Sequence, residues 1–211
     1  MKPRAHQRFY LFPYLGLVLA SIATAQAAEV TNSAGSLSLD QQIEAMARYA
    51  LPGREHQVLT RMAGTWEAVT RYWMRPDVEP AESKGTSTRK WILDGRFLME
   101  ELDGGNLALP FRGVGLFGYD AFEKKYSSAW ADTTSTAILT NLGFFDKTNN
   151  VVNFTGEYKD PWTGTRKKSR GLVRFVGPDR QVLELHVTEA SGREFLMLEI
   201  TYTRKEAGRS P

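Results

Sequence analysis

Between residues 65 and 203 the chain repeats one pattern, in which short segments of alternating side chains are each followed by turn-forming residues. The segments are rich in Val, Thr and aromatic residues, which favour β-strands. Connectors such as Asp94-Gly95 and Asp103-Gly104-Gly105 are typical of tight turns. No helical pattern separates the segments, so the sequence predicts an antiparallel meander. The expected strands are residues 65–74, 85–93, 96–102, 112–119, 126–133, 137–144, 151–158, 166–176, 181–188 and 194–203.

A meander of about ten strands closes most economically into a barrel, because closure removes the unpaired edge strands. We therefore expect a mainly β fold: a single antiparallel up-and-down β-barrel of about ten strands, preceded by one or two short N-terminal helices. Several strands carry apolar groups on both faces, which suits a wall that lines a cavity. In the last strand the expected apolar face consists of Leu196, Leu198, Ile200 and Tyr202.

The first 28 residues have the pattern of an export signal. Lys2, Arg4 and Arg8 precede an apolar run, and Ala25-Gln26-Ala27 matches a cleavage site of the small-x-small type. The apolar run is about 15 residues long, shorter than the roughly 20 that a membrane-spanning helix needs. We expect a cleaved signal peptide, with an N-terminal anchor helix as the alternative. The mature protein would be periplasmic or secreted and would have no integral membrane segment.

The rest of the chain is expected to form one domain behind a helical segment. Ser38 and Gln41 have the spacing of a capping box, and Pro52-Gly53 ends the helix that they begin. A second short helix is expected at residues 54–62, and together the two helices would cover one mouth of the barrel. The predicted organisation is a signal peptide at 1–28, a disordered lead-in at 29–37, a helical cap at 38–63, the β-barrel at 64–205 and a tail at 206–211.

Charge and cysteine content exclude several classes of function. The whole chain has 27 Lys and Arg against 24 Asp and Glu, but three of the bases and none of the acids lie before residue 28. The rest of the chain is therefore near neutral, which gives no support for nucleic-acid binding. The sequence has no cysteine, which excludes thiolate catalysis, iron–sulfur clusters and thiolate zinc sites.

Residues 111–132 carry the most distinctive pattern of the chain. Gly113-x-Gly115-x-x-Gly118 matches the dinucleotide-binding fingerprint, but Tyr119-Asp120 leads into a turn where that fold requires a helix. The glycines instead remove side chains from one strand face. Their absence either lets another element approach closely or leaves room for a ligand.

The same stretch provides most of the candidate ligand-binding residues. In the predicted strand 126–133, a polar and aromatic face is suited either to a ligand-lined interior or to a core centred on Trp130 in which Asp132 is hydrogen-bonded. Arg96 would either bind a carboxylate or phosphate through two hydrogen bonds or pair with a nearby acid such as Glu100. The candidate ligand-binding residues are Arg96, Phe117, Tyr119, Tyr126, Trp130 and Asp132.

The sequence predicts no catalytic residues, no metal site and no cofactor. Only His56 and His186 follow the leader, and their spacing matches neither a zinc site nor a nucleophilic triad. No pair of carboxylates is placed to argue for general acid–base chemistry. A single histidine remains conceivable as an axial haem ligand.

Several short motifs together resemble one bacterial family, known as domain of unknown function 1579, over residues 52–204. The motifs are His56…Leu59…Ala63-Gly64-Thr65-Trp66, Gly85, Leu93-Asp94-Gly95-Arg96-Phe97, Phe111-x-Gly113-x-Gly115-x-x-Gly118-Tyr119-Asp120, Tyr126, Trp130-x-Asp132, Gly143 and Thr201-Tyr202-Thr203-Arg204. The resemblance implies a lipocalin-like (calycin-type) barrel and no established activity. Gly64-Thr65-Trp66 is similar to the lipocalin Gly-x-Trp start, which implies that Trp66 packs across the barrel bottom. A looser resemblance to nitrobindin-type barrels implies the haem alternative.

Three functions remain open at this point. The first is an exported carrier that binds a small apolar or amphipathic ligand in the barrel. The second is an enzyme acting on a small organic substrate in the same cavity, with Asp132 or Glu199 as the acid–base group and Arg96 holding an anion. The third is a fully packed structural or interaction domain. No nucleic-acid partner is expected, and the sequence sets neither the ligand nor the oligomeric state.

Overall fold

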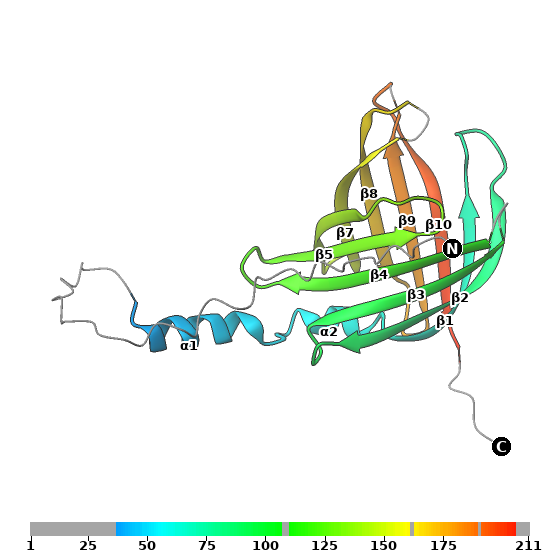
Figure 1. Ribbon diagram of the computed structural model, residues 1–211. Coiled ribbons are helices and arrows are strands. Elements are labelled where there is room, and N and C mark those ends of the chain that lie inside the picture. The colour runs from blue at the N-terminus through cyan, green and yellow to red at the C-terminus, as the bar shows by residue number, and fades with distance from the viewer. Residues whose placement is uncertain (1–36, 107–109, 161–162, 190, 206–211) are drawn as a thin grey trace, which may run out of the picture.

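The computed structural model describes residues 37–106, 110–160, 163–189 and 191–205 (Figure 1). The predicted signal peptide, the predicted tail from residue 206 and all of the predicted lead-in except Leu37 lie outside these residues.

Within the described residues, two helices precede ten strands. The strands form one closed antiparallel barrel in the order β1-β10-β9-β8-β7-β6-β5-β4-β3-β2 (Figure 1). This confirms the expected fold class. The elements are α1 (Leu39–Ala50), α2 (His56–Thr60), β1 (Gly64–Tyr72), β2 (Ala81–Ile92), β3 (Phe97–Asn106), β4 (Pro110–Asp120), β5 (Lys125–Asp132), β6 (Leu139–Asp146), β7 (Val151–Lys159), β8 (Arg166–Phe175), β9 (Arg180–Thr188) and β10 (Glu194–Arg204).

The turn predicted at Asp103-Gly104-Gly105 is wrong, because β3 continues through these residues to Asn106. The pairing of β3 with β4 is irregular here, and Gly105 has a φ of 71°. On the neighbouring strand, any side chain at Gly85 would collide with the Asp103 carbonyl. The glycines therefore allow a close, bent contact between two strands, and they do not end one.

The apolar face predicted for the last strand is also wrong at one position. The pairing of β10 with β9 shifts by one residue, so that Leu196 lies opposite His186 whereas Leu198 lies opposite Leu185. Directly paired residues share a face of the sheet. The extra residue reverses the alternation and places Leu196 on the outer face with His186.

The two helices differ in their contact with the barrel. The predicted capping box of α1 is present, with the Gln41 amide donating to Ser38 Oγ at 3.2 Å and the Ser38 amide donating to Gln41 Oε1 at 2.9 Å. None of the residues of α1, all of which the structure describes, is buried, and the helix extends away from the barrel (Figure 1). Helix α2 instead buries His56 and Leu59. The expected helical cap therefore covers the barrel with α2 alone.

The end of the barrel beside α2 is packed. Leu59 and Met62 pack against the buried side chains of the barrel and are at most 1% exposed. Trp66, which is fully buried, donates from Nε1 to the Met62 carbonyl at 2.9 Å. The other buried side chains packed with Leu59 and Met62 are Leu98, Phe117, Tyr126, Val152, Phe154, Val173 and Phe175.

Candidate functional site

A buried ion pair lies inside the barrel, and the sequence reasoning missed it. Arg89 on β2 and Glu100 on β3 are 2% and 1% exposed, with Nη2 and Oε1 at 3.0 Å. Ser87 Oγ donates to the same Glu100 oxygen at 2.6 Å, and Arg89 Nη1 donates to Gln181 Oε1 at 3.0 Å. The guanidinium lies 4.1 Å from the centre of the Tyr202 ring. We call these five residues the interior polar cluster.

The interior polar cluster is balanced in charge. Burial opposes the charged form of Arg89, but the adjacent Glu100 carboxylate and the Tyr202 phenol oxygen together outweigh burial and raise the pKa of the guanidinium. Burial also raises the pKa of Tyr202. Both effects keep the cluster as a fixed ion pair with a neutral phenol, which suits a structural role more than proton transfer.

The interior is less filled beyond this cluster, at the end away from α2. Apolar side chains there pack against a second buried group, which includes Leu102 and Ile200 as well as Trp66, but remain only partly buried. They belong to the inner face, because they alternate with buried or inward-facing neighbours along their strands. The partly buried inner residues are Phe111, Trp130, Leu183 and Leu198, of which Leu183 also packs against the packed end. We call the space that they line the open half.

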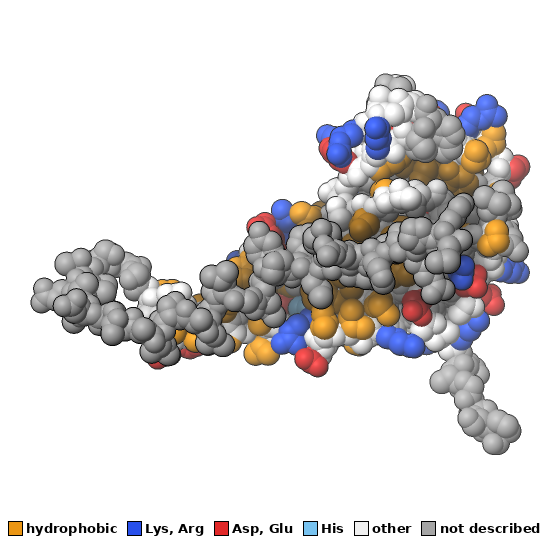
Figure 2. Space-filling view, viewed as in Figure 1, with side chains coloured by type: hydrophobic (Ala, Val, Ile, Leu, Met, Phe, Trp, Pro, Cys, Tyr) orange, Lys and Arg blue, Asp and Glu red, His pale blue; other side chains and the backbone are white. Residues whose placement is uncertain are grey.

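Solvent reaches an inward side chain of a closed barrel chiefly through one of its ends. The partial exposure of the residues in the open half therefore indicates that solvent reaches them from this end. Figure 2 shows hydrophobic side chains in the hollow above β5, where Figure 1 places the strands β8, β9 and β10. The interior thus has a packed end beside α2 and an apolar recess at the opposite end.

Two of the six predicted ligand-binding residues lie in the open half. Trp130 Nε1 donates to Asp132 Oδ2 at 2.9 Å, and Asp132 Oδ1 accepts from the amide and hydroxyl of Thr134 at 2.8 and 2.6 Å. The Trp130 ring lies against Gly113 and Gly115, where an added Cβ would meet ring atoms. Of the two interpretations of these glycines, close packing is therefore the correct one.

The other four predicted residues lie elsewhere. Phe117 and Tyr126 are buried in the packed end, and the Tyr119 ring is 5.0 Å from that of Tyr126. Arg96 lies at the turn between β2 and β3, where it donates to the Leu93 carbonyl at 3.1 Å. Its Nη1 is 3.4 Å from an exposed carboxylate oxygen of Asp94. The structure does not bring Arg96 to the aromatic residues.

The histidines are separated from the open half. His56 Nδ1 accepts a hydrogen bond from the Gly53 amide at 3.0 Å within the packed end. His186 lies on the outer face of β9, 3.1 Å from Glu184 Oε2. Among the residues that the structure describes, no cluster of three or more histidines and carboxylates is arranged to hold a metal ion. No described helix has the length and apolar content to span a membrane.

Tyr126 links β5 to the residue that precedes α2, and the pKa of its hydroxyl is raised. It is 4% exposed, and its hydroxyl donates to the Glu55 carbonyl at 3.0 Å. Burial, followed by the charge of Glu55, raises the pKa of Tyr126 to about 12.

This shift predicts a contribution of Tyr126 to alkaline unfolding. An unfolded tyrosine loses its proton near pH 10, whereas folded Tyr126 keeps it to about pH 12, so stability falls as the pH rises through this window. Tyr126→Phe should reduce the drop in Tm between about pH 9 and about pH 12. At neutral pH the variant should lose about 0.5–1.5 kcal/mol with the hydrogen bond. Identical alkaline profiles for the two proteins would contradict this assignment.

The sequence profile of one protein family matches this chain. It is described as "Protein of unknown function (DUF1579)" and matches residues 51–204. The chain belongs to this family. The match covers almost all of the described DUF1579 domain, including the packed end, the interior polar cluster and the open half. No curated protein matches the chain.

One solved structure supports the fold of this DUF1579 protein. It is similar to the crystal structure of Rv2717c from M. tuberculosis, with a TM-score of 0.51 and 14% identity over 73% of this chain and 99% of that one. At this identity the likeness shows the fold alone. A redesigned β-barrel, b11L5F_LGL, has a TM-score of 0.31 with 16% identity over 71% and 96% of the two chains. The structure of EF1p2_mFAP2b bound to DFHBI has a TM-score of 0.35 with 13% identity over 71% and 98%.

Proposed function

We propose that this DUF1579 protein is a carrier that binds a small apolar or amphipathic molecule in the open half of its barrel. The observation that carries the proposal is the partial exposure of inward-facing Phe111, Trp130, Leu183 and Leu198 beside a packed end. Covering apolar surface is favourable by about 25 cal/mol per Å². An apolar ligand would therefore gain affinity from this recess.

The arrangement of polar groups favours a carrier over an enzyme. The Asp132 carboxylate already accepts hydrogen bonds from Trp130 and Thr134. Glu199, the other candidate acid, lies on the outer face 3.6 Å from Arg71. Arg96 lies at a distant turn. The groups that an acid–base mechanism would use are therefore dispersed. Export from the cytoplasm belongs to the same proposal and is supported by the leader pattern of the first 28 residues.

Trp130→Ala should weaken binding in the open half by about 10- to 100-fold, because the indole provides a large flat apolar surface there. The affinity can be measured by fluorescence titration with the amphipathic dye 1-anilinonaphthalene-8-sulfonate. Val114→Ala is the matched control, since Val114 lies on the outer face of β4 and is 51% exposed. The control should bind like the wild type. Equal affinities for all three proteins would overturn the assignment of this site.

The natural ligand can be sought by native mass spectrometry of protein purified without detergent, followed by solvent extraction. A discrete additional mass that solvent releases would give the ligand class. A Soret band in the same sample would replace the proposed apolar ligand with haem.

A further inference from the structure

Helix α1 has an apolar face that contacts little of its own barrel. Leu39, Ile43 and Met46 recur at helical spacing and are 71%, 56% and 69% exposed. A helix of this length is marginal in water without tertiary packing. We therefore expect this apolar face to be buried against another surface in the functional state of the protein.

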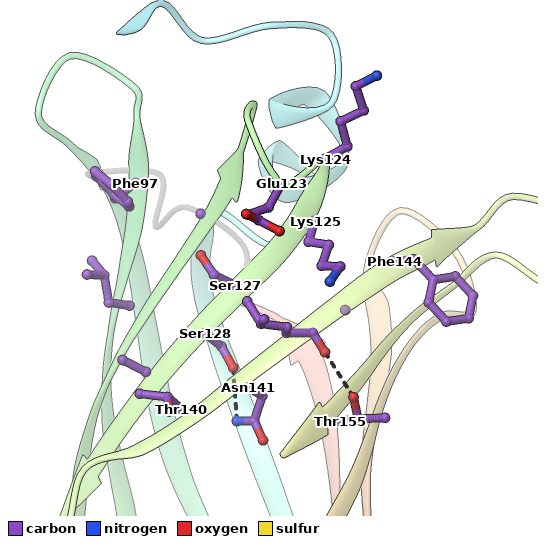
Figure 3. Close-up of a pocket in the computed structure, with 15 residues that line it drawn as sticks. Phe97, Glu123, Lys124, Lys125, Ser127, Ser128, Thr140, Asn141, Phe144 and Thr155 are labelled. Carbon is purple, nitrogen blue, oxygen red and sulfur yellow. Dashed lines mark hydrogen bonds between the residues drawn. The ribbon is translucent and has the colours of Figure 1, made fainter. Parts of the chain in front are cut away.

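A matching concavity lies on the outer wall of the barrel. It has a volume of about 860 Å³ and runs over strands β3 to β7. We call it the outer groove. Leu116, Leu142 and Phe144 line it and are 37%, 47% and 61% exposed, while small residues such as Ala129 leave space between them. Figure 3 shows Phe97 and Phe144 on opposite sides of this groove.

The helix and the groove agree in size. The groove crosses five neighbouring strands, from Phe97 on β3 to Thr155 on β7, a width of about 19 Å, and along β5 it extends from Lys125 to Ala129, about 13 Å. A 12-residue helix such as α1 is about 18 Å long and about 10 Å wide. One helix therefore fills the groove.

The charges also agree. Helix α1 carries Asp40, Glu44 and Arg48, a net charge of minus one. The end of the groove carries Glu123, Lys124 and Lys125, a net charge of plus one. The net charge of α1 does not suit an anionic membrane surface, for which a basic polar face is typical.

The helix is held away from the groove of its own chain. The Tyr49 ring stacks on Phe122 of the β4–β5 turn, with centroids 3.8 Å apart and an interplanar angle of 18°. With this contact in place, α1 extends outward from the barrel (Figure 1). Its apolar face is thereby left exposed.

We propose that α1 of one copy docks in the outer groove of a second copy. Each copy has one helix and one groove, so the exchange is reciprocal and gives a two-fold dimer. Two such contacts bury roughly 1,000–1,400 Å² in total, near the lower limit of specific interfaces. The dimer is independent of ligand binding in the open half.

The test is sedimentation velocity of the mature chain over a range of concentrations. The wild type should dimerise, and Ile43→Glu on the helix or Leu142→Glu in the groove should each raise the dimer Kd at least about tenfold. Gln41→Glu is the control, because it adds the same charge on the side of the helix opposite the apolar face and keeps the capping box. It should leave the Kd unchanged.

Mixing the two damaged variants gives the sharper result. A glutamate buried in this apolar contact is expected to abolish it, so neither variant alone keeps a contact. A mixed dimer keeps one intact contact, between the helix of the Leu142→Glu copy and the groove of the Ile43→Glu copy. The mixture should therefore associate more tightly than either variant alone. The proposal would be overturned if the wild type is monomeric or if neither substitution changes the dimer Kd. It would also be overturned if the mixture associates no more tightly than the single variants. Co-sedimentation of a monomeric wild type with phosphatidylcholine vesicles would assign the helix to a membrane surface instead.

Discussion

Glu100→Ala is expected to lower the free energy of unfolding by about 3–5 kcal/mol. Glu100 is the counter-charge of Arg89, and both side chains are 1% exposed. Removing the carboxylate leaves a guanidinium inside the barrel with no opposite charge and leaves Ser87 Oγ without its acceptor. Urea unfolding at neutral pH measures the loss.

Two further variants test whether the loss of stability comes from the unpaired buried charge and not from the removal of any ion pair. Glu82→Ala removes the partner of Arg71 in an ion pair whose side chains are about half exposed, and should cost less than about 1 kcal/mol. The double variant Arg89→Met with Glu100→Leu should recover much of the loss, because an apolar pair of similar volume avoids the burial of charge. It also removes Arg89 Nε, the buried side-chain nitrogen without a partner among the described residues. A loss below about 1 kcal/mol for Glu100→Ala would contradict the prediction.

The sequence contained the signal for this pair, although the prediction placed the important cation at Arg96. Asp94-Gly95 is typical of a tight turn between two strands. In a hairpin centred on these two residues, Arg89 lies directly opposite Glu100, as the observed register shows. Extending the register from the turn would have brought the two charges together on one face. Arg96 is too close to the turn to enter the barrel, and it bonds to the turn itself.

The ten strands and their closure could be predicted because each strand carries its own alternation and its own turn residues. Features that depend on contacts between strands could not. The irregular step that moves Leu196 to the outer face leaves no local mark in an apolar run. The separation of α1 from the barrel is likewise invisible, because an apolar helical face predicts burial without naming the partner.

The candidate site could be predicted only in part, for a related reason. Alternation correctly places Trp130 and Tyr126 on one face, but it does not say how far along the barrel each one lies. Tyr126 is beside α2 and is buried, whereas Trp130 is beyond the interior polar cluster and is partly exposed. The choice between a ligand wall and a core residue depends on that position, which is set by the helix that closes one end.

Trp66→Ala is expected to destabilise the fold by about 3–5 kcal/mol, the range of large-to-small changes in a core. Trp66 is 0% exposed, and its Nε1 donates to the Met62 carbonyl at 2.9 Å. The Arg204 guanidinium lies 4.0 Å from the ring centre and donates from Nη1 to the Ala63 carbonyl at 2.8 Å. The indole thus joins the turn after α2 to the last strand. Its removal leaves a cavity where the chain enters the barrel.

Trp66→Phe separates the packing of this residue from its hydrogen bond. Phenylalanine keeps an aromatic ring against Arg204 but leaves the Met62 carbonyl unpaired in a buried position, so the expected loss is about 1–3 kcal/mol. If the indole mainly fills space, Trp66→Ala must be clearly the less stable of the two variants in urea unfolding. Equal losses would mean that the hydrogen bond to Met62 dominates. A loss below about 1 kcal/mol for Trp66→Ala would show that the barrel end does not depend on this residue.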